Sequence, residues 1–178
     1  AEVTPLATEF LVEAASGGSC VVRIVSSAFG TGADWEQEFF EQMNEGWGPY
    51  FQHLRLYLTH FPGQTATPMH AEAEVKAAPV AVAAAVLSAL GLTAASGPGD
   101  PVGLRGVPAV VEHIGDQHVV ARLVDDPSGY FAFFAYDKGD GISVANLTGY
   151  LFSGAAAGYV DREQPGWQAW LGDLEVLS

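Results

Sequence analysis

The fold is indicated first by VVRIVSSAFG, residues 21–30, and by the aromatic-rich segment that follows it as far as Phe61. Residues 8–14 alternate between apolar and other side chains, a Gly-Gly pair supplies a turn, and residues 20–25 are rich in β-branched side chains. This pattern predicts a β-hairpin. Two strands alone are only marginally stable in water. We therefore expect the hairpin to pair its free edge with strands from the rest of the chain or from a second copy.

A long amphipathic helix is predicted after the hairpin, over residues 34–61. Asp34 is suited to cap its N-terminus, with Gln37 three positions later. Apolar side chains then recur every three or four residues, as a helix with one apolar face requires. They are Trp35, Phe39, Met43, Trp47, Phe51, Leu54, Leu58 and Phe61. Glycine and proline within residues 46–49 predict a kink, because proline removes a backbone donor.

The chain is expected to contain two units. Residues 1–63 would hold the hairpin and the long helix, residues 64–70 a polar, proline-containing linker, and residues 71–178 a second α+β unit. The second unit is predicted to begin with a strand over residues 71–76 and a helix that starts at Pro79 and ends at Gly91. A loop at 96–101, four strands at 107–113, 119–124, 130–136 and 142–152, and a helix at 154–177 interrupted at Pro165-Gly166 would follow.

Composition limits the function classes. The 178 residues carry 21 acidic and seven basic side chains, a formal net charge of −14, and the basic ones are scattered. Nucleic-acid binding needs clustered Lys and Arg, so it is excluded. No apolar run reaches the ~18–20 residues of a membrane span, so no membrane association is expected. The single cysteine, Cys20, is interpreted as a small core side chain, and a chain without disulfides is expected to be cytoplasmic.

Residues 7–61 resemble a known family. The run VRIVSSAFG (22–30), Asp34-Trp35-Glu36, Gly46-Trp47 and LRLYL (54–58) is similar to the C-terminal end of bacterial homologues of the heat-shock-protein-90 ATPase activator, which belong to the SRPBCC or START-like superfamily. The resemblance implies an α+β helix-grip fold, in which a curved antiparallel sheet wraps a long C-terminal helix and leaves an apolar cavity between them.

The resemblance is incomplete at its N-terminal side. The strands and small helices that precede the hairpin in that family are not seen before residue 7, so the N-terminal unit looks truncated. A protein partner or a homodimer is expected to complete its sheet. Residues 71–178 resemble the same fold more faintly, on AEVKAAPVAV (73–82). The alternative is an unrelated α+β domain with helices on one face of an antiparallel sheet.

The candidate ligand-binding residues are aromatic side chains of the predicted helices and strands, which would form the core or a cavity wall. They are Trp35, Phe39, Trp47, Phe51, Tyr136, Tyr150, Trp167 and Trp170. No catalytic residue, metal ligand or cofactor is expected.

Several polar side chains are further candidates, each with a structural alternative. His113 and His118 flank a turn, with Glu112 or Asp116 nearby, but lack the spacing of a metal site. His53 and His60 lie seven residues apart, so on a helix they share a face and could orient a ligand. The alternative is that both are ordinary half-exposed side chains. Arg23 and Arg122 could neutralise a ligand carboxylate, although pairing with a neighbouring acid explains them as well.

Two functions remain from the sequence. The first is a START-like protein that binds a small hydrophobic ligand between sheet and helix without catalysis. The alternative is a protein interaction module related to chaperone-ATPase activators. An enzyme of the cyclase or hydrolase kind is a third and weaker hypothesis.

Overall fold

The computed structural model describes residues 6–28 and 49–176, and the chain divides into two units, Ala1–Tyr50 and Phe51–Ser178. The smaller unit contains the antiparallel strands β1 (Leu6–Ala14) and β2 (Cys20–Ala28), joined by a 3₁₀ turn, η1 (Ser16–Gly18). The predicted hairpin is therefore confirmed, but among the described strands it forms a two-stranded sheet of its own and pairs with no strand from the rest of the chain. Cys20 is exposed rather than buried, because it lies at the turn end of the hairpin. The predicted N-cap at Asp34 and the kink before residue 49 lie outside the described residues.

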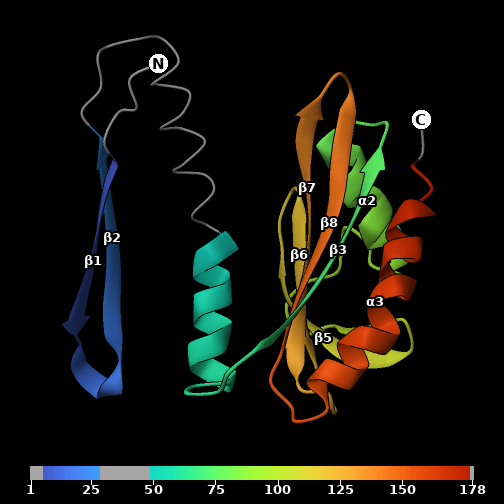
Figure 1. The fold of residues 1–178 in the computed structure, drawn as a ribbon. Coiled ribbons are helices and arrows are strands. Elements are labelled where there is room, and N and C mark those ends of the chain that lie inside the picture. The colour runs from blue at the N-terminus through green and yellow to red at the C-terminus, as the bar shows by residue number, and fades with distance from the viewer. Residues whose placement is uncertain (1–5, 29–48, 177–178) are drawn as a thin grey trace. The chain divides into compact units, whose positions relative to one another are not determined.

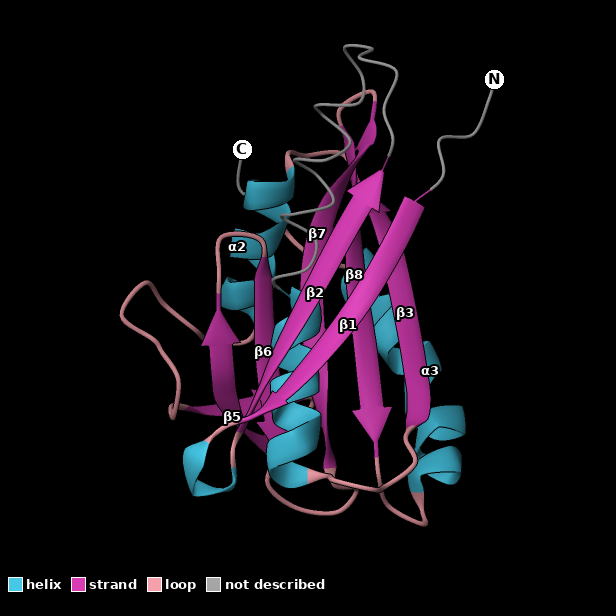
Figure 2. Ribbon diagram, turned by 90° about the vertical axis from the view of Figure 1, so that its left-hand side faces the viewer, coloured by secondary structure: helices cyan, strands magenta, loops and turns pink. Residues whose placement is uncertain are grey.

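The larger unit is built on one six-stranded antiparallel sheet with the strand order β3-β8-β7-β6-β5-β4. Its strands are β3 (Thr67–Val75), β4 (Pro101–Leu104), β5 (Val107–Ile114), β6 (His118–Leu123), β7 (Gly129–Gly139) and β8 (Ile142–Leu151). Figure 2 shows β6, β7, β8 and β3 next to one another. The order follows the chain from β4 to β8, and β3 then pairs with β8. The first and last strands of this unit are therefore neighbours.

Helices cover both faces of this sheet (Figure 1). Helices α2 (Pro79–Ala89) and α3 (Ala156–Gly172) pack on the face that we call the inner face. Residues 49–60 are also helical, and the part that belongs to the larger unit, residues 51–60, packs on the opposite, outer face. We call residues 51–60 the covering helix.

The inner face holds the larger core. Alternate residues of each strand point to it, as the pleat of a strand requires. Its fully buried side chains include Met69, Leu104, Val111, Phe131, Phe133, Leu147, Trp167 and Leu171. On the outer face a smaller cluster joins Leu56 and Phe61 to Val120, Tyr130 and Ala132. The sheet therefore has an apolar layer on each side.

Most predicted elements of this unit are confirmed, and the differences have physical reasons. Strand β3 begins at Thr67, within residues 64–70, rather than after a separate linker, because Met69 and Ala71 are each only 1% exposed in the core. Strand β4 was missed, since its four residues, PVGL, contain proline and glycine.

Helix α3 runs without interruption through Pro165. Proline removes one hydrogen bond from the helix, but Tyr159, Trp167 and Leu171 are buried on both sides of it and keep the helix on the sheet. Gln164 and Gln168 of the same helix accept hydrogen bonds from the backbone N–H groups of His70 (3.3 Å) and Glu72 (3.2 Å). These bonds protect the free edge of β3, which would otherwise be open to pairing with another chain.

The larger unit therefore has the predicted α+β helix-grip architecture, an antiparallel sheet packed against a long C-terminal helix. In the described part of the chain, no helix combines the length and the apolar character needed to cross a membrane.

Candidate functional sites on the two faces of the sheet

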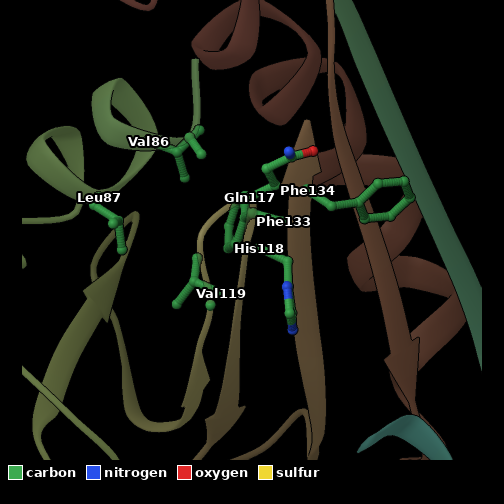
Figure 3. A pocket seen from close by; sticks show the side chains of 9 residues that line it. Val86, Leu87, Gln117, His118, Val119, Phe133 and Phe134 are labelled. Carbon is green, nitrogen blue, oxygen red and sulfur yellow. The ribbon is translucent and has the colours of Figure 1, made fainter. Parts of the chain in front are cut away.

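The space between the sheet and α3, where the sequence predicted a ligand cavity, is filled by aromatic side chains. Trp167 is 0% exposed and packs edge-on against Phe131, with ring centroids 5.5 Å apart. It also contacts Phe133 at 5.6 Å. A cavity of about 10 Å³ lies nearby, between Val86 and Leu87 of α2 and the residues around His118 and Phe133 (Figure 3). That volume holds at most one water molecule.

A larger groove lies between α2 and α3. Its volume is about 600 Å³, within the ~300–1,000 Å³ range of small-molecule sites. Small and apolar side chains form much of its wall, including Ala85 of α2, Trp170 of α3 and Leu174, which follows α3. Arg105 stands on one side, and Asp173 with Glu175 near the C-terminal end of α3. One cation and two carboxylates therefore flank a partly apolar surface.

Arg105 is held in place by its turn and by α3. It joins β4 to β5 in a two-residue hairpin turn, where Arg105 has φ 51° and Gly106 has φ 87°. Positive φ at both central positions is typical of a type I′ turn, although it is strained for an arginine. The Nη1 group donates a hydrogen bond of 2.9 Å to the carbonyl oxygen of Gly166, and the guanidinium lies 5.5 Å from the centre of the Trp167 ring. A side chain at Gly166 would collide with this guanidinium, because a Cβ there would lie 2.3 Å from Nη2.

The outer face carries a polar site beneath the covering helix. A cleft of about 470 Å³ lies between this helix and strands β5 and β6, lined by residues that include Arg55, His60, Glu112 and His113. Glu112 accepts a hydrogen bond of 2.6 Å from Arg122 Nε and lies 4.0 Å from His60 Nε2. Arg122 is therefore paired with a neighbouring acid, one of the two alternatives that the sequence left open.

A β-bulge places two polar residues side by side in this cleft. The register of β5 against β6 shifts between Val111 and His113, so Glu112 is an extra residue in β5. A bulge sets two residues of one strand against one residue of its neighbour. Glu112 and His113 consequently both reach the outer face, where His113 stacks on His118 with ring centroids 4.6 Å apart. Gly115 leaves room for this stack, because a Cβ there would lie 2.5 Å from His118 Cε1.

His53 projects from the covering helix onto the sheet. Its ring lies 5.4 Å from the ring of Tyr130 and 5.5 Å from that of Tyr150. Burial lowers the pKa of His53, and the nearby His118 lowers it further. Burial also lowers the pKa of His118, His113 adds to this effect, and Asp116 opposes it. Burial and then Tyr150 raise the pKa of Tyr130, so its phenol stays protonated.

The five predicted ligand-binding residues that the structure describes lie in different places. Trp35, Phe39 and Trp47 lie outside the described residues. Of the other five, Trp167 lies in the inner core, Trp170 in the α2–α3 groove, and Phe51 on the covering helix. Tyr150 lies against the outer cluster, and Tyr136 lines a groove of about 560 Å³ together with Lys138 and Glu74.

Arg105 was missed as a candidate site residue. Its only signal in the sequence is the Arg-Gly pair between two short apolar runs, which is typical of a tight hairpin turn. Among the described residues, no group of three or more His, Cys, Asp or Glu side chains is placed to bind a metal ion.

The fold and these sites define a helix-grip α+β protein with a groove beside its C-terminal helix. No protein-family model matches the chain, and no curated protein matches it. Solved structures do match. CalU16 from Micromonospora echinospora is 12% identical, with 62% of this chain and 82% of CalU16 covered and a TM-score of 0.45.

Two further structures are similar to the chain. The Aha1 dimer from Colwellia psychrerythraea is 11% identical, with 59% of this chain and 90% of that chain covered and a TM-score of 0.45. The di-domain ARO/CYC protein BexL from the BE-7585A biosynthetic pathway is 13% identical, with 93% of this chain and 68% of that chain covered and a TM-score of 0.39. At these TM-scores, none of the three likenesses supports an inference about activity.

Proposed function

We propose that the protein binds a small, partly apolar molecule with one carboxylate in the groove between α2 and α3. The observation that supports this most directly is the groove itself, about 600 Å³ in volume, with Trp170 in its wall and Arg105 at its side. An aromatic ring gives a flat apolar contact surface, and a guanidinium matches the planar geometry of a carboxylate. The ligand site thus lies beside α3 rather than between α3 and the sheet.

The charges of the groove restrict the ligand further. Arg105 uses Nη1 for Gly166, and a guanidinium has five N–H donors in all, so it can also donate to a carboxylate. Asp173 and Glu175 lie near the C-terminal end of α3, where they would repel a second negative group. The groove therefore favours a ligand with a single anionic end over a dianion.

Calorimetric titration with a matched pair of probes tests this proposal. Naphthoate and its neutral analogue naphthalene methanol share a ring system and differ in charge. We expect Arg105→Gln to weaken naphthoate binding about tenfold, the usual effect of losing one charge-assisted hydrogen bond, and to leave the neutral analogue unchanged. Trp170→Leu should weaken both probes.

Arg162→Gln is the matched control. Arg162 lies on α3, the helix that carries Trp170, and its guanidinium is 5.5 Å from the centre of the Tyr159 ring. It is not among the residues that line the groove. It should leave both titrations unchanged. The proposal fails if the wild-type protein binds neither probe at millimolar concentration, or if the two arginine variants behave alike.

A second candidate function is association with a protein partner or a second copy through the hairpin. Both of its faces carry exposed apolar side chains, with Phe10 61%, Val12 66%, Val21 50% and Val25 41% exposed. Light scattering distinguishes this function from the first. Val12→Lys should reduce the molar mass of any dimer and leave probe binding in the groove intact, because a lysine on a strand edge disfavours pairing.

A further inference from the structure

Four of the five histidines gather where the covering helix meets the outer face of the sheet. His53 and His60 come from the helix, His113 from β5 and His118 from β6. We call these four residues the histidine cluster. The two pairs are about sixty residues apart in the chain, so only the packing of the helix on the sheet brings them together.

Two ring nitrogens of the cluster are poorly placed to carry a proton. His53 Nδ1 and His118 Nε2 are buried, and neither has a hydrogen-bond partner among the described residues. His118 also stacks on His113, at 4.6 Å between ring centroids. Two protonated imidazoles at that separation would repel each other, and a buried charge without a partner is costly.

The charged and titratable groups around the cluster do little to stabilise a protonated His53 or His118. The covering helix contributes Arg55 and His60, β5 contributes Glu112, the following turn Asp116, β6 Arg122, β7 Tyr130 and β8 Tyr150. Glu112 is paired with Arg122 at 2.6 Å, which leaves His60 at 4.0 Å as its second contact. Asp116 favours a protonated His118, whereas His53 faces the uncharged rings of Tyr130 and Tyr150.

We infer that the histidine cluster is a pH-sensitive latch, which holds the covering helix on the sheet while His53 and His118 are neutral and releases it when they are protonated. Release frees both imidazoles to solvent and separates His53 from His118. It also uncovers the aromatic residues of the outer face, including Tyr130 and Tyr150.

The direction of the effect follows from proton binding. The pKa values of His53 and His118 in the docked state lie below the ordinary value of 6.5. The released state therefore binds more protons, and it gains population as the pH falls below about 6.5. If a histidine stays neutral while the helix is docked and has an ordinary pKa once the helix is released, its protonation raises the ratio of released to docked protein by up to about tenfold at pH 5.5.

Hydrogen–deuterium exchange measured by mass spectrometry tests the latch on the whole chain. Exchange of the covering helix is compared at about pH 7.5 and pH 5.5, with each rate divided by the intrinsic rate at that pH, so that only changes in opening remain. We expect protection of residues 53–60 to fall about tenfold at the lower pH. At both pH values the covering helix should be less protected than α3 and β7, because release of the helix leaves the rest of the unit folded.

Variants identify the groups responsible. The double variant His53→Gln and His118→Gln keeps polar side chains that do not titrate, and it should abolish the fall in protection. His70→Gln is the matched control, because His70 lies on β3 with its side chain 57% exposed and contacts Glu72 at 3.4 Å. It should preserve the wild-type response.

Three results would overturn the latch. One is equal protection of residues 53–60 at both pH values in the wild-type protein. Another is a fall that persists in the double variant. The third is equal protection of residues 53–60, α3 and β7 at each pH, which would show that the covering helix opens only when the whole unit unfolds. The wild-type comparison needs no variant, so the latch can be refuted even if the double variant folds poorly.

Discussion

Replacing Trp167 by alanine should be among the most damaging single changes in the larger unit. The side chain is 0% exposed and touches three aromatic rings, those of Phe131 (5.5 Å), Phe133 (5.6 Å) and Trp170 (5.4 Å). Truncation of a buried tryptophan costs about 3–5 kcal/mol, as lost burial plus the cavity left behind. The upper half of that range is expected, because the ring packs between the sheet and α3 and its removal also takes the aromatic surface from beneath Arg105.

Urea unfolding followed by circular dichroism measures this loss. Trp170→Ala is the matched control on the same helix, and its half-buried ring should cost about 1–2 kcal/mol. Trp167→Phe keeps an aromatic ring against Phe131 and should fall between the two. A Trp167→Ala variant that is destabilised no more than Trp170→Ala, with an unchanged denaturant slope, would refute the argument that Trp167 organises the inner core.

Three other outcomes are expected. Gly129→Ala should lower the free energy of unfolding by about 1–3 kcal/mol in the same assay, because the new Cβ would lie 2.3 Å from the backbone oxygen of Tyr150 in β8. The control Gly97→Ala should leave stability unchanged, because a Cβ there would have no atom within 4 Å. Glu112→Gln should cost about 1–2 kcal/mol through its part-buried ion pair with Arg122. The control Glu74→Gln, whose side chain is 57% exposed and pairs with Lys138, should cost much less because solvent screens an exposed pair. Equal thermal shifts of the two variants would contradict this. Folding stability should fall as the pH drops below about 6.5, because His53 and His118, partly buried between the covering helix and the sheet, bind protons more readily in the unfolded chain. A flat pH profile of the unfolding midpoint would refute this prediction.

The sequence predicted those strands and helices whose pattern of apolar and turn residues is visible within the segment itself and matches the way the segment is buried in the fold. Strands β5 to β8 alternate or are rich in β-branched and aromatic residues, and they are bounded by turn residues, so they were predicted to within a few positions. Strand β4 has no such pattern and depends on pairing with β5 across the Arg105 turn. The start of β3 at Thr67 depends on pairing with Leu151 at the far end of the unit.

The candidate sites were less predictable, because each is assembled from distant segments. Ala85, Arg105 and Trp170 form one groove although they belong to three separate elements. Helical spacing did indicate that His53 and His60 share a face. That this face meets His113 and His118 follows only from the docking of the covering helix on the outer face.

The bulge in β5 makes the outer face sensitive to the number of residues in one strand. Without the extra residue, side chains at positions 112 and 113 would point in opposite directions, and either the partner of Arg122 or the ring that stacks on His118 would be directed into the apolar interior. A deletion of one residue between Val111 and Ile114 would therefore disrupt the charges of the outer face more than most substitutions there. In β5, substitutions should therefore be tolerated better than insertions or deletions.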